Sequence, residues 1–200
     1  MVYPDSKHDS PLDMGHCYED LIGLLLKRYY DFKVSFYRSK FEQYNIGESA
    51  EGLEVKLDLW CTRTRRLSIE VAEKTSEGQS SFSPSGIMRN DNTKIYSQGN
   101  LERCWFFEKL ALRGVYRNLK PWLIDNNPPT IRKFYLSLRE AESLAIFTLR
   151  VSPFVCDYGH ILDCKWDNCL PCAKYQGGEC LSDGAKLYHR IKQCFNEGDK

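Results

Sequence analysis

Long apolar runs are missing from this 200-residue sequence, and no stretch approaches the roughly 20 residues that a bilayer-spanning helix needs. The first ten residues are polar and lack the apolar core of a signal peptide. The net charge is only +1, so no global positive field points to a protein that binds nucleic acid by charge alone. We therefore expect a cytoplasmic globular protein that does not enter a membrane.

Cysteine, in contrast, is abundant: the chain has nine, and five of them fall between positions 156 and 180. In a reducing compartment this density favours metal ligation over disulfides. Two residues separate Cys169 from Cys172, a spacing that lets both thiolates reach one tetrahedral ion. We predict a structural Zn²⁺ site formed by Cys164, Cys169, Cys172 and Cys180, with Cys156 and His160 as alternates.

Hydrophobic periodicity predicts the order of the elements. A helical stripe begins at Tyr18, and period-two alternation predicts strands at 32–37, 52–60 and 67–74. A loop at 75–93, strands at 95–96 and 101–107, a helix at 109–119 and a strand at 134–138 follow. This order indicates an α/β fold around a mixed sheet. We divide the chain into a mobile N-terminal arm (1–17), a core (18–152) and a Cys-rich metal-binding module with a terminal helix (153–200).

Chemistry-bearing residues gather where 52–60 and 67–74 are expected to form an antiparallel hairpin. Residues two apart share one face of a strand, so Glu54, Lys56 and Asp58 point the same way. A turn near Arg63-Thr64 would place Asp58 opposite Glu70. Two carboxylates beside a lysine suit a Mg²⁺ ion that activates water for phosphodiester hydrolysis. Glu54, at the far end of the hairpin, is predicted to form a salt bridge.

The ordered motifs resemble the PD-(D/E)xK, restriction-endonuclease-like superfamily of nucleases. Gly15 followed by Glu19 on the first helix, Asp58 on one strand, and Glu70 on the next are similar to its acidic residues. Position 72 is Ala where that family has Lys, and Lys56 is the candidate replacement. The motifs Glu54-Val-Lys-Leu-Asp, Ile69-Glu and Pro84-Ser-Gly-Ile are also similar to uncharacterised nuclease-like proteins of phages and mobile elements.

The resemblance implies an α-β-β-β-α-β core and a DNA endonuclease that depends on Mg²⁺ or Mn²⁺. Glu19, Asp58 and Glu70 would hold the ion, and Lys56 would position the attacking water. Some nucleases of this superfamily close a 4Fe-4S cluster with one cysteine before the core and three after it. Cys17 with Cys169, Cys172 and Cys180 resembles that plan, which stays open beside zinc.

Predicted DNA contacts lie in the hairpin turn and in the long loop. Their cationic and hydroxyl side chains suit phosphate oxygens. They are Arg63, Arg65, Arg66, Ser85, Arg89 and Lys94. Two alternatives stay open: an inactive nuclease-like module that binds nucleic acid or protein and carries structural zinc, and an enzyme that uses the cysteine-bound metal catalytically. The oligomeric state is open, a homodimer included.

Overall fold

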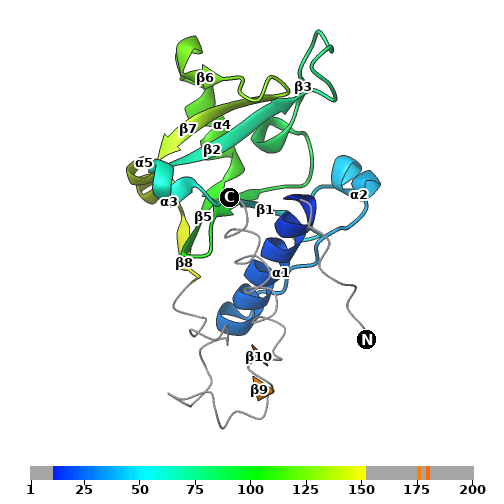
Figure 1. Ribbon diagram of the computed structural model, residues 1–200, viewed down its shortest axis with the longest axis vertical. Coiled ribbons are helices and arrows are strands. Elements are labelled where there is room, and N and C mark those ends of the chain that lie inside the picture. The colour runs from blue at the N-terminus through cyan, green and yellow to red at the C-terminus, as the bar shows by residue number, and fades with distance from the viewer. Residues whose placement is uncertain (1–10, 152–174, 177–178, 181–200) are drawn as a thin grey trace. The chain divides into compact units, whose positions relative to one another are not determined.

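The computed structural model describes residues 11–151, 175–176 and 179–180, which form a mixed α/β protein (Figure 1). The chain divides into two compact units. One contains residues up to Lys33, with 101–103 and the chain from Arg150 onward; the other contains 34–100 and 104–149. No helix within the described residues is both long and apolar enough to cross a bilayer.

Helix α1 (Pro11–Tyr30) belongs to the first unit. It buries the predicted stripe, including Tyr18, Leu21 and Leu25. The helix ends where Asp31 takes a left-handed conformation (φ 52°) and the amide of Phe32 donates to the carbonyl of Leu26. Because α1 begins at Pro11, it includes residues that we assigned to the arm.

A strand predicted at 32–37 is wrong. The residues that follow α1 are irregular, and Phe36 alone makes a β-bridge, with Ser49. The short helix α2 (Lys40–Asn45) comes next and is capped by the Ser39 side chain, which accepts from the amide of Glu42. The period-two alternation of these residues therefore did not indicate membership of a sheet.

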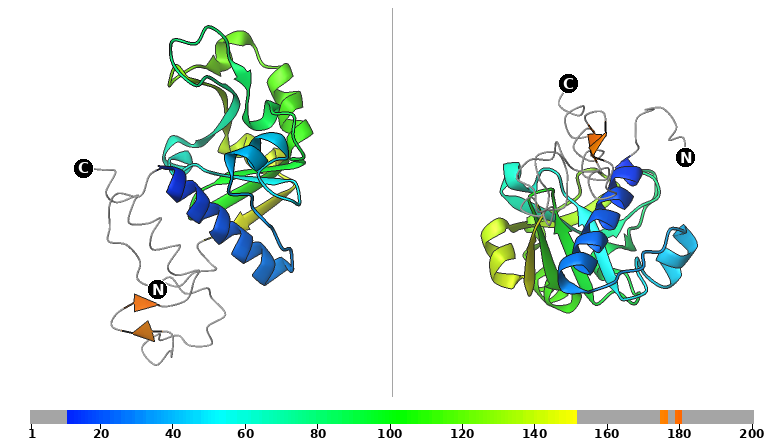
Figure 2. Two further views of the ribbon diagram at one scale, coloured as in Figure 1. Left: turned by 90° about the vertical axis from the view of Figure 1, so that its right-hand side faces the viewer. Right: turned by 90° about the horizontal axis from the view of Figure 1, so that it is seen from below.

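Two four-stranded sheets form the framework of the second unit, and both can be followed in Figures 1 and 2. The first has the order β1-β4-β5-β8, with bounds Leu53–Leu57, Ile95–Gly99, Arg103–Glu108 and Phe147–Arg150. It is mixed, because β1 runs parallel to β4 while β4 and β5 are antiparallel. The second is antiparallel with the order β3-β2-β7-β6, bounded by Ser83–Pro84, Arg66–Glu73, Ile131–Ser137 and Ile124–Asp125.

The predicted hairpin of β1 and β2 is wrong, because the two strands belong to different sheets. Between them the chain forms a short helix, α3 (Cys61–Thr64), which ends at Arg65 in the left-handed conformation (φ 58°). Strand β1 instead pairs with β4, from Leu53 opposite Ile95 to Leu57 opposite Gly99. The alternation located both strands but could not specify their partners.

The remaining elements of the second unit are η1 (Gly86–Met88), α4 (Lys109–Arg117), η2 (Pro121–Leu123) and α5 (Leu138–Leu144). In the first unit, β9 (Tyr175–Gln176) and β10 (Glu179–Cys180) pair with each other in an antiparallel two-stranded sheet. A capping box of Ser137 and Glu140 starts α5. The predicted strands at 95–96 and 101–107 and the predicted helix at 109–119 are confirmed as β4, β5 and α4.

The core of the second unit joins side chains from both sheets with α4 and α5. Each large apolar side chain that is fully buried contributes roughly 1.5–3 kcal/mol. Its fully buried members include Leu67, Ile69, Ile87, Phe107, Leu112 and Phe134. Cys61 of α3 lies in the same cluster.

Candidate functional site

Asp58 follows β1 and connects the two sheets. Its Oδ2 accepts from the amide of Ser68 on β2 (3.1 Å) and from Nε2 of Gln98 on β4 (3.0 Å). Gln98 also donates to the Ser68 carbonyl (3.0 Å), while its Oε1 accepts from the Tyr96 hydroxyl (3.1 Å). Burial raises the pKa of Asp58 and outweighs these hydrogen bonds, which act to lower it.

Glu70 lies on β2 and is held by the Pro84-Ser-Gly loop. The Ser85 hydroxyl donates to Oε1 of Glu70, and the Ser85 amide donates to the carbonyl of Val71 (3.1 Å). Burial raises the pKa of Glu70, against the opposing effects of the Ser85 hydrogen bond and the Lys56 charge. The Pro84-Ser-Gly loop therefore packs directly on Glu70, the predicted metal ligand.

Ala72 does not share a face with Glu70, although alternation predicted that it would. A β-bulge shifts the pairing with β7, so that Glu70 lies opposite Lys133 and Ala72 opposite Arg132. Val71 and Ala72 are consequently both buried. A lysine at position 72 would enter the apolar core, which explains why this chain has alanine there. Nζ of Lys74, the first residue after β2, lies 4.5 Å from the centre of the Phe82 ring.

Lys56 lies between two carboxylates. Its Nζ is 3.1 Å from Oε1 of Glu54 and 3.3 Å from Oε1 of Glu48. Burial would lower the pKa of Lys56, but the carboxylates of Glu54 and Glu48 outweigh it and raise the pKa above its usual value. The predicted salt bridge of Glu54 is confirmed. The Glu54 side chain is fully buried, and among the described residues its carboxylate is balanced by the ion pairs with Lys56 and Arg89.

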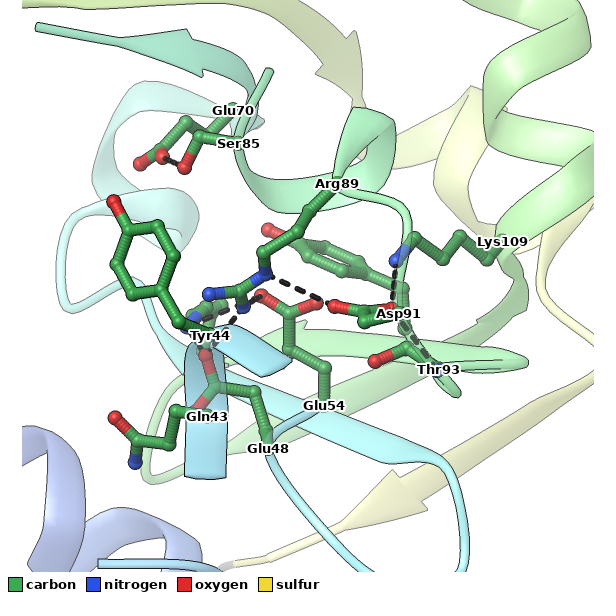
Figure 3. Close-up of polar contacts among 12 residues, drawn as sticks. Gln43, Tyr44, Glu48, Glu54, Glu70, Ser85, Arg89, Asp91, Thr93 and Lys109 are labelled. Atoms are coloured by element: carbon green, nitrogen blue, oxygen red, sulfur yellow. Dashed lines mark hydrogen bonds and ion pairs between the residues drawn. The ribbon is translucent and has the colours of Figure 1, made fainter. Parts of the chain in front are cut away.

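Arg89 extends this network from the loop after η1. Its Nη2 is 2.6 Å from Oε1 of Glu48, and its Nε is 2.9 Å from Oδ2 of Asp91. Asp91 also accepts from Nζ of Lys109 (2.6 Å), the first residue of α4. Figure 3 shows these side chains converging around Glu54. The structure therefore places Arg89, predicted to contact DNA, in an ion-pair network with only 13% of its side chain exposed.

The other predicted DNA contacts differ in exposure. Arg63, Arg65, Arg66 and Lys94 are exposed. The Ser85 hydroxyl is committed to Glu70, and the residue is 5% exposed. Four of the six predicted contacts are therefore accessible to a large ligand.

Tyr96 shows how the acidic side chains are grouped. Burial raises the pKa of its phenol, and the charges of Glu54, Glu70, Asp58 and Glu48 raise it further, in that order. These carboxylates come from β1, β2 and the segments flanking β1, yet all act on one buried hydroxyl. Among the described residues, however, no three His, Cys, Asp or Glu side chains form a group that could hold a metal ion by themselves.

The remaining predicted ligands lie elsewhere. Glu19 is on α1, in the first unit, and its part in a shared metal site stays a prediction. Cys180 lies in β10, and Cys17 is buried in α1. Cys156, His160, Cys164, Cys169 and Cys172 lie outside the described residues.

Sequence reasoning missed Gln98, Tyr96, Asp91 and Lys109. Tyr96 and Gln98 are two apart on β4, so the alternation of that strand could have indicated a polar face. Asp91 and Lys109 are 18 residues apart, and their pairing carries no local signal in the sequence.

Comparison with known proteins gives no relative: no family model, no curated protein and no solved structure matches the chain.

Gly86→Ala tests the contact between the Pro84-Ser-Gly loop and β2. Gly86 has φ +48°, and an added Cβ would lie 3.1 Å from Cβ of Glu70 and closer still to the Glu70 carbonyl oxygen. We expect the substitution to lower the free energy of unfolding by about 2–4 kcal/mol, combining left-handed strain with overpacking. Urea denaturation measures this.

Gly114→Ala is the matched control, because a Cβ at Gly114 in α4 meets no atom within 4 Å. It should leave stability unchanged or raise it by up to about 1 kcal/mol. Equal stabilities for the two variants would contradict the proposed packing of the loop on Glu70.

Proposed function

We propose that this protein is a DNA endonuclease that depends on a divalent cation, with its reactive centre at Asp58 and Glu70. The observation that carries the proposal is a pair of half-buried carboxylates, both with raised pKa, in one group of acidic side chains around Tyr96. At both residues the effect of burial, which raises the pKa, is larger than the effect of the hydrogen bonds and positive charges that lower it. A divalent cation would supply the compensating charge.

The donor chemistry fits Mg²⁺ or Mn²⁺. Both residues offer carboxylate oxygens, the hard ligands that Mg²⁺ prefers, and Mg²⁺ in enzymes is usually held by one or two carboxylates plus waters and phosphate oxygens. Two protein ligands are therefore sufficient for this ion. When bound, such an ion polarises the phosphate and lowers the pKa of the attacking water.

The chain's own residues have separate roles in this proposal. Asp58 and Glu70 hold the cation, and Ser85 fixes the Glu70 carboxylate by donating to Oε1. Lys56 acts on Glu70 through its charge and is 38% exposed on its side chain, so it can face a phosphate. Its ion pairs with Glu48 and Glu54 keep it cationic, which suits charge stabilisation rather than proton abstraction.

A second candidate is an inactive nuclease-like module that binds nucleic acid or protein. Two observations favour it. Lys56 already forms ion pairs with two carboxylates, and Ala72 lies in the apolar core. Under this second candidate function, the carboxylates around Tyr96 would stabilise the fold and would hold no catalytic metal ion.

Plasmid cleavage distinguishes the two candidates. We expect the purified full-length chain to cut plasmid DNA in Mg²⁺ or Mn²⁺ and not in EDTA, and Asp58→Asn to lose this activity. Asn keeps an oxygen that can accept from Ser68 and Gln98, so this variant removes charge while sparing the connection between the sheets. No cutting by the wild type in either metal, on supercoiled or linear DNA, would favour the binding module.

A further inference from the structure

A strip that contains two cations crosses the sheet next to the proposed centre, where Lys133 lies between Glu70 on β2 and Asp125 on β6. Arg66 and Glu70 share a face of β2, and Tyr135 and Lys133 share a face of β7. In the register of these strands Ser68 lies opposite Tyr135 and Glu70 opposite Lys133. Arg66, Tyr135 and Lys133 therefore form one continuous strip, which we call the β2–β7 strip.

The two cations of the strip both lie against the ring of Tyr135. The Arg66 guanidinium carbon lies 3.7 Å from the centre of the Tyr135 ring, and Nζ of Lys133 lies 5.6 Å from it. The Tyr135 hydroxyl donates to Oδ2 of Asp125 on β6 (2.6 Å), which fixes the ring. A guanidinium stacked on a fixed ring loses less conformational freedom on binding and keeps its N–H donors at the edge for an anion.

The strip leads towards the two carboxylates of the proposed centre. Lys133 is the cross-strand neighbour of Glu70. Arg66 is four residues from Glu70 on one strand, a separation of about 13 Å at roughly 3.3 Å per residue. A backbone that meets Arg66 first and Lys133 next would therefore reach Glu70 at the end of the strip.

We infer that the β2–β7 strip binds the phosphodiester backbone of a nucleic-acid strand and directs it to Asp58 and Glu70. The inference rests on the proposed function, because it names the substrate surface of the same site. Arg66 and Lys133 are the phosphate-contacting residues, and Tyr135 is a positioning residue. No base readout is involved, so binding is independent of sequence and sensitive to salt.

Fluorescence anisotropy with labelled single-stranded and duplex oligonucleotides in EDTA tests the strip without any cleavage. Arg66→Gln and Lys133→Gln should each weaken binding by about three- to tenfold at low salt. Each should also reduce the slope of log affinity against log salt by about 0.7 for a single strand or about 0.9 for a duplex. A purely structural role would leave that slope unchanged.

Arg117→Gln is the matched control, because Arg117 is an exposed cation at the end of α4, on another element. It loses the same charge and should keep the wild-type slope. If Arg66→Gln and Lys133→Gln also keep the wild-type slope and affinity with both probes, the inference is wrong. Displacement of the oligonucleotide by inorganic phosphate at constant ionic strength would also overturn it, in favour of a site for a small anion.

The binding assay separates this inference from the proposed function. Loss of binding in both strip variants, with no cleavage by the wild type in Mg²⁺ or Mn²⁺, would support the strip and remove the nuclease proposal. Cleavage by the wild type, with unchanged binding by both strip variants, would support the nuclease and overturn the strip.

Discussion

Glu70→Gln is expected to reduce metal-dependent DNA cleavage by at least about 100-fold, on the scale seen when one electrostatic contact to a transition state is removed. Glutamine keeps an oxygen that can accept from Ser85, so the loop that packs on β2 should stay in place. The variant loses the negative charge that would hold the cation. Plasmid nicking rates over a Mg²⁺ titration measure the effect.

Glu77→Gln is the control for this variant. Glu77 is an exposed glutamate in the loop after β2, and the substitution removes the same charge. Its cleavage rate should equal that of the wild type. If Glu70→Gln cuts at the wild-type rate while its circular dichroism spectrum shows a native fold, then Glu70 holds no catalytic metal.

Arg89→Met should lower the free energy of unfolding by about 3–5 kcal/mol at neutral pH, the cost of removing one partner from a buried ion pair. The guanidinium pairs with Glu48 and Asp91 and lies 3.6 Å from Oε1 of Glu54. Methionine fills similar space without charge, so the loss is electrostatic rather than a cavity. Chemical denaturation of wild type and variant gives the difference.

The deficit of Arg89→Met should shrink as the pH falls. Burial alone would raise the pKa of Glu48, but Lys56 and Arg89 hold it below its usual value. This contribution to wild-type stability is present above the unfolded pKa of Glu48 and is lost as the pH falls through the folded pKa. Without Arg89 the pKa of Glu48 rises. As the pH falls, protonation of Glu48 removes a poorly compensated buried charge from the variant, whereas in the wild type it removes an ion pair and lowers the free energy of unfolding.

The two stability curves should therefore converge between about pH 6 and pH 3, around the ordinary range for carboxyl groups. Arg117→Met, which removes an exposed arginine, should track the wild type at every pH within about 0.5 kcal/mol. A deficit of Arg89→Met that is constant with pH would mean that packing, and not charge, explains the loss.

Local signals in the sequence predicted the elements better than their partners. The alternation of β2 and the helical pattern of α4 are properties of neighbouring residues, and both elements are present. The parallel pairing of β1 with β4 joins residues about 40 positions apart, such as Leu53 and Ile95. Turn chemistry at Arg63 to Arg66 was compatible with a hairpin, but the chain uses a short helix there instead.

The candidate site was predictable to the same extent. The pairing of Glu54 with Lys56 follows from a spacing of two residues on one strand. The bulge after Glu70 carries no such signal, because Val71-Ala72 is apolar and either residue could face the core. The part of Gln98 in holding Asp58 depends on two sheets meeting, which local periodicity does not report.

The hydrogen bonds that Asp58 and Gln98 make to Ser68 also cover part of the edge of β2. Among the described strands, β3 pairs with β2 only at Ala72 and Glu73, so on that side no described strand lies beside the peptide group of Ser68. Unpaired peptide groups along a strand are templates for edge-to-edge aggregation. Since one side chain accepts from the Ser68 amide and the other donates to its carbonyl, this part of β2 offers no template to a strand from another molecule.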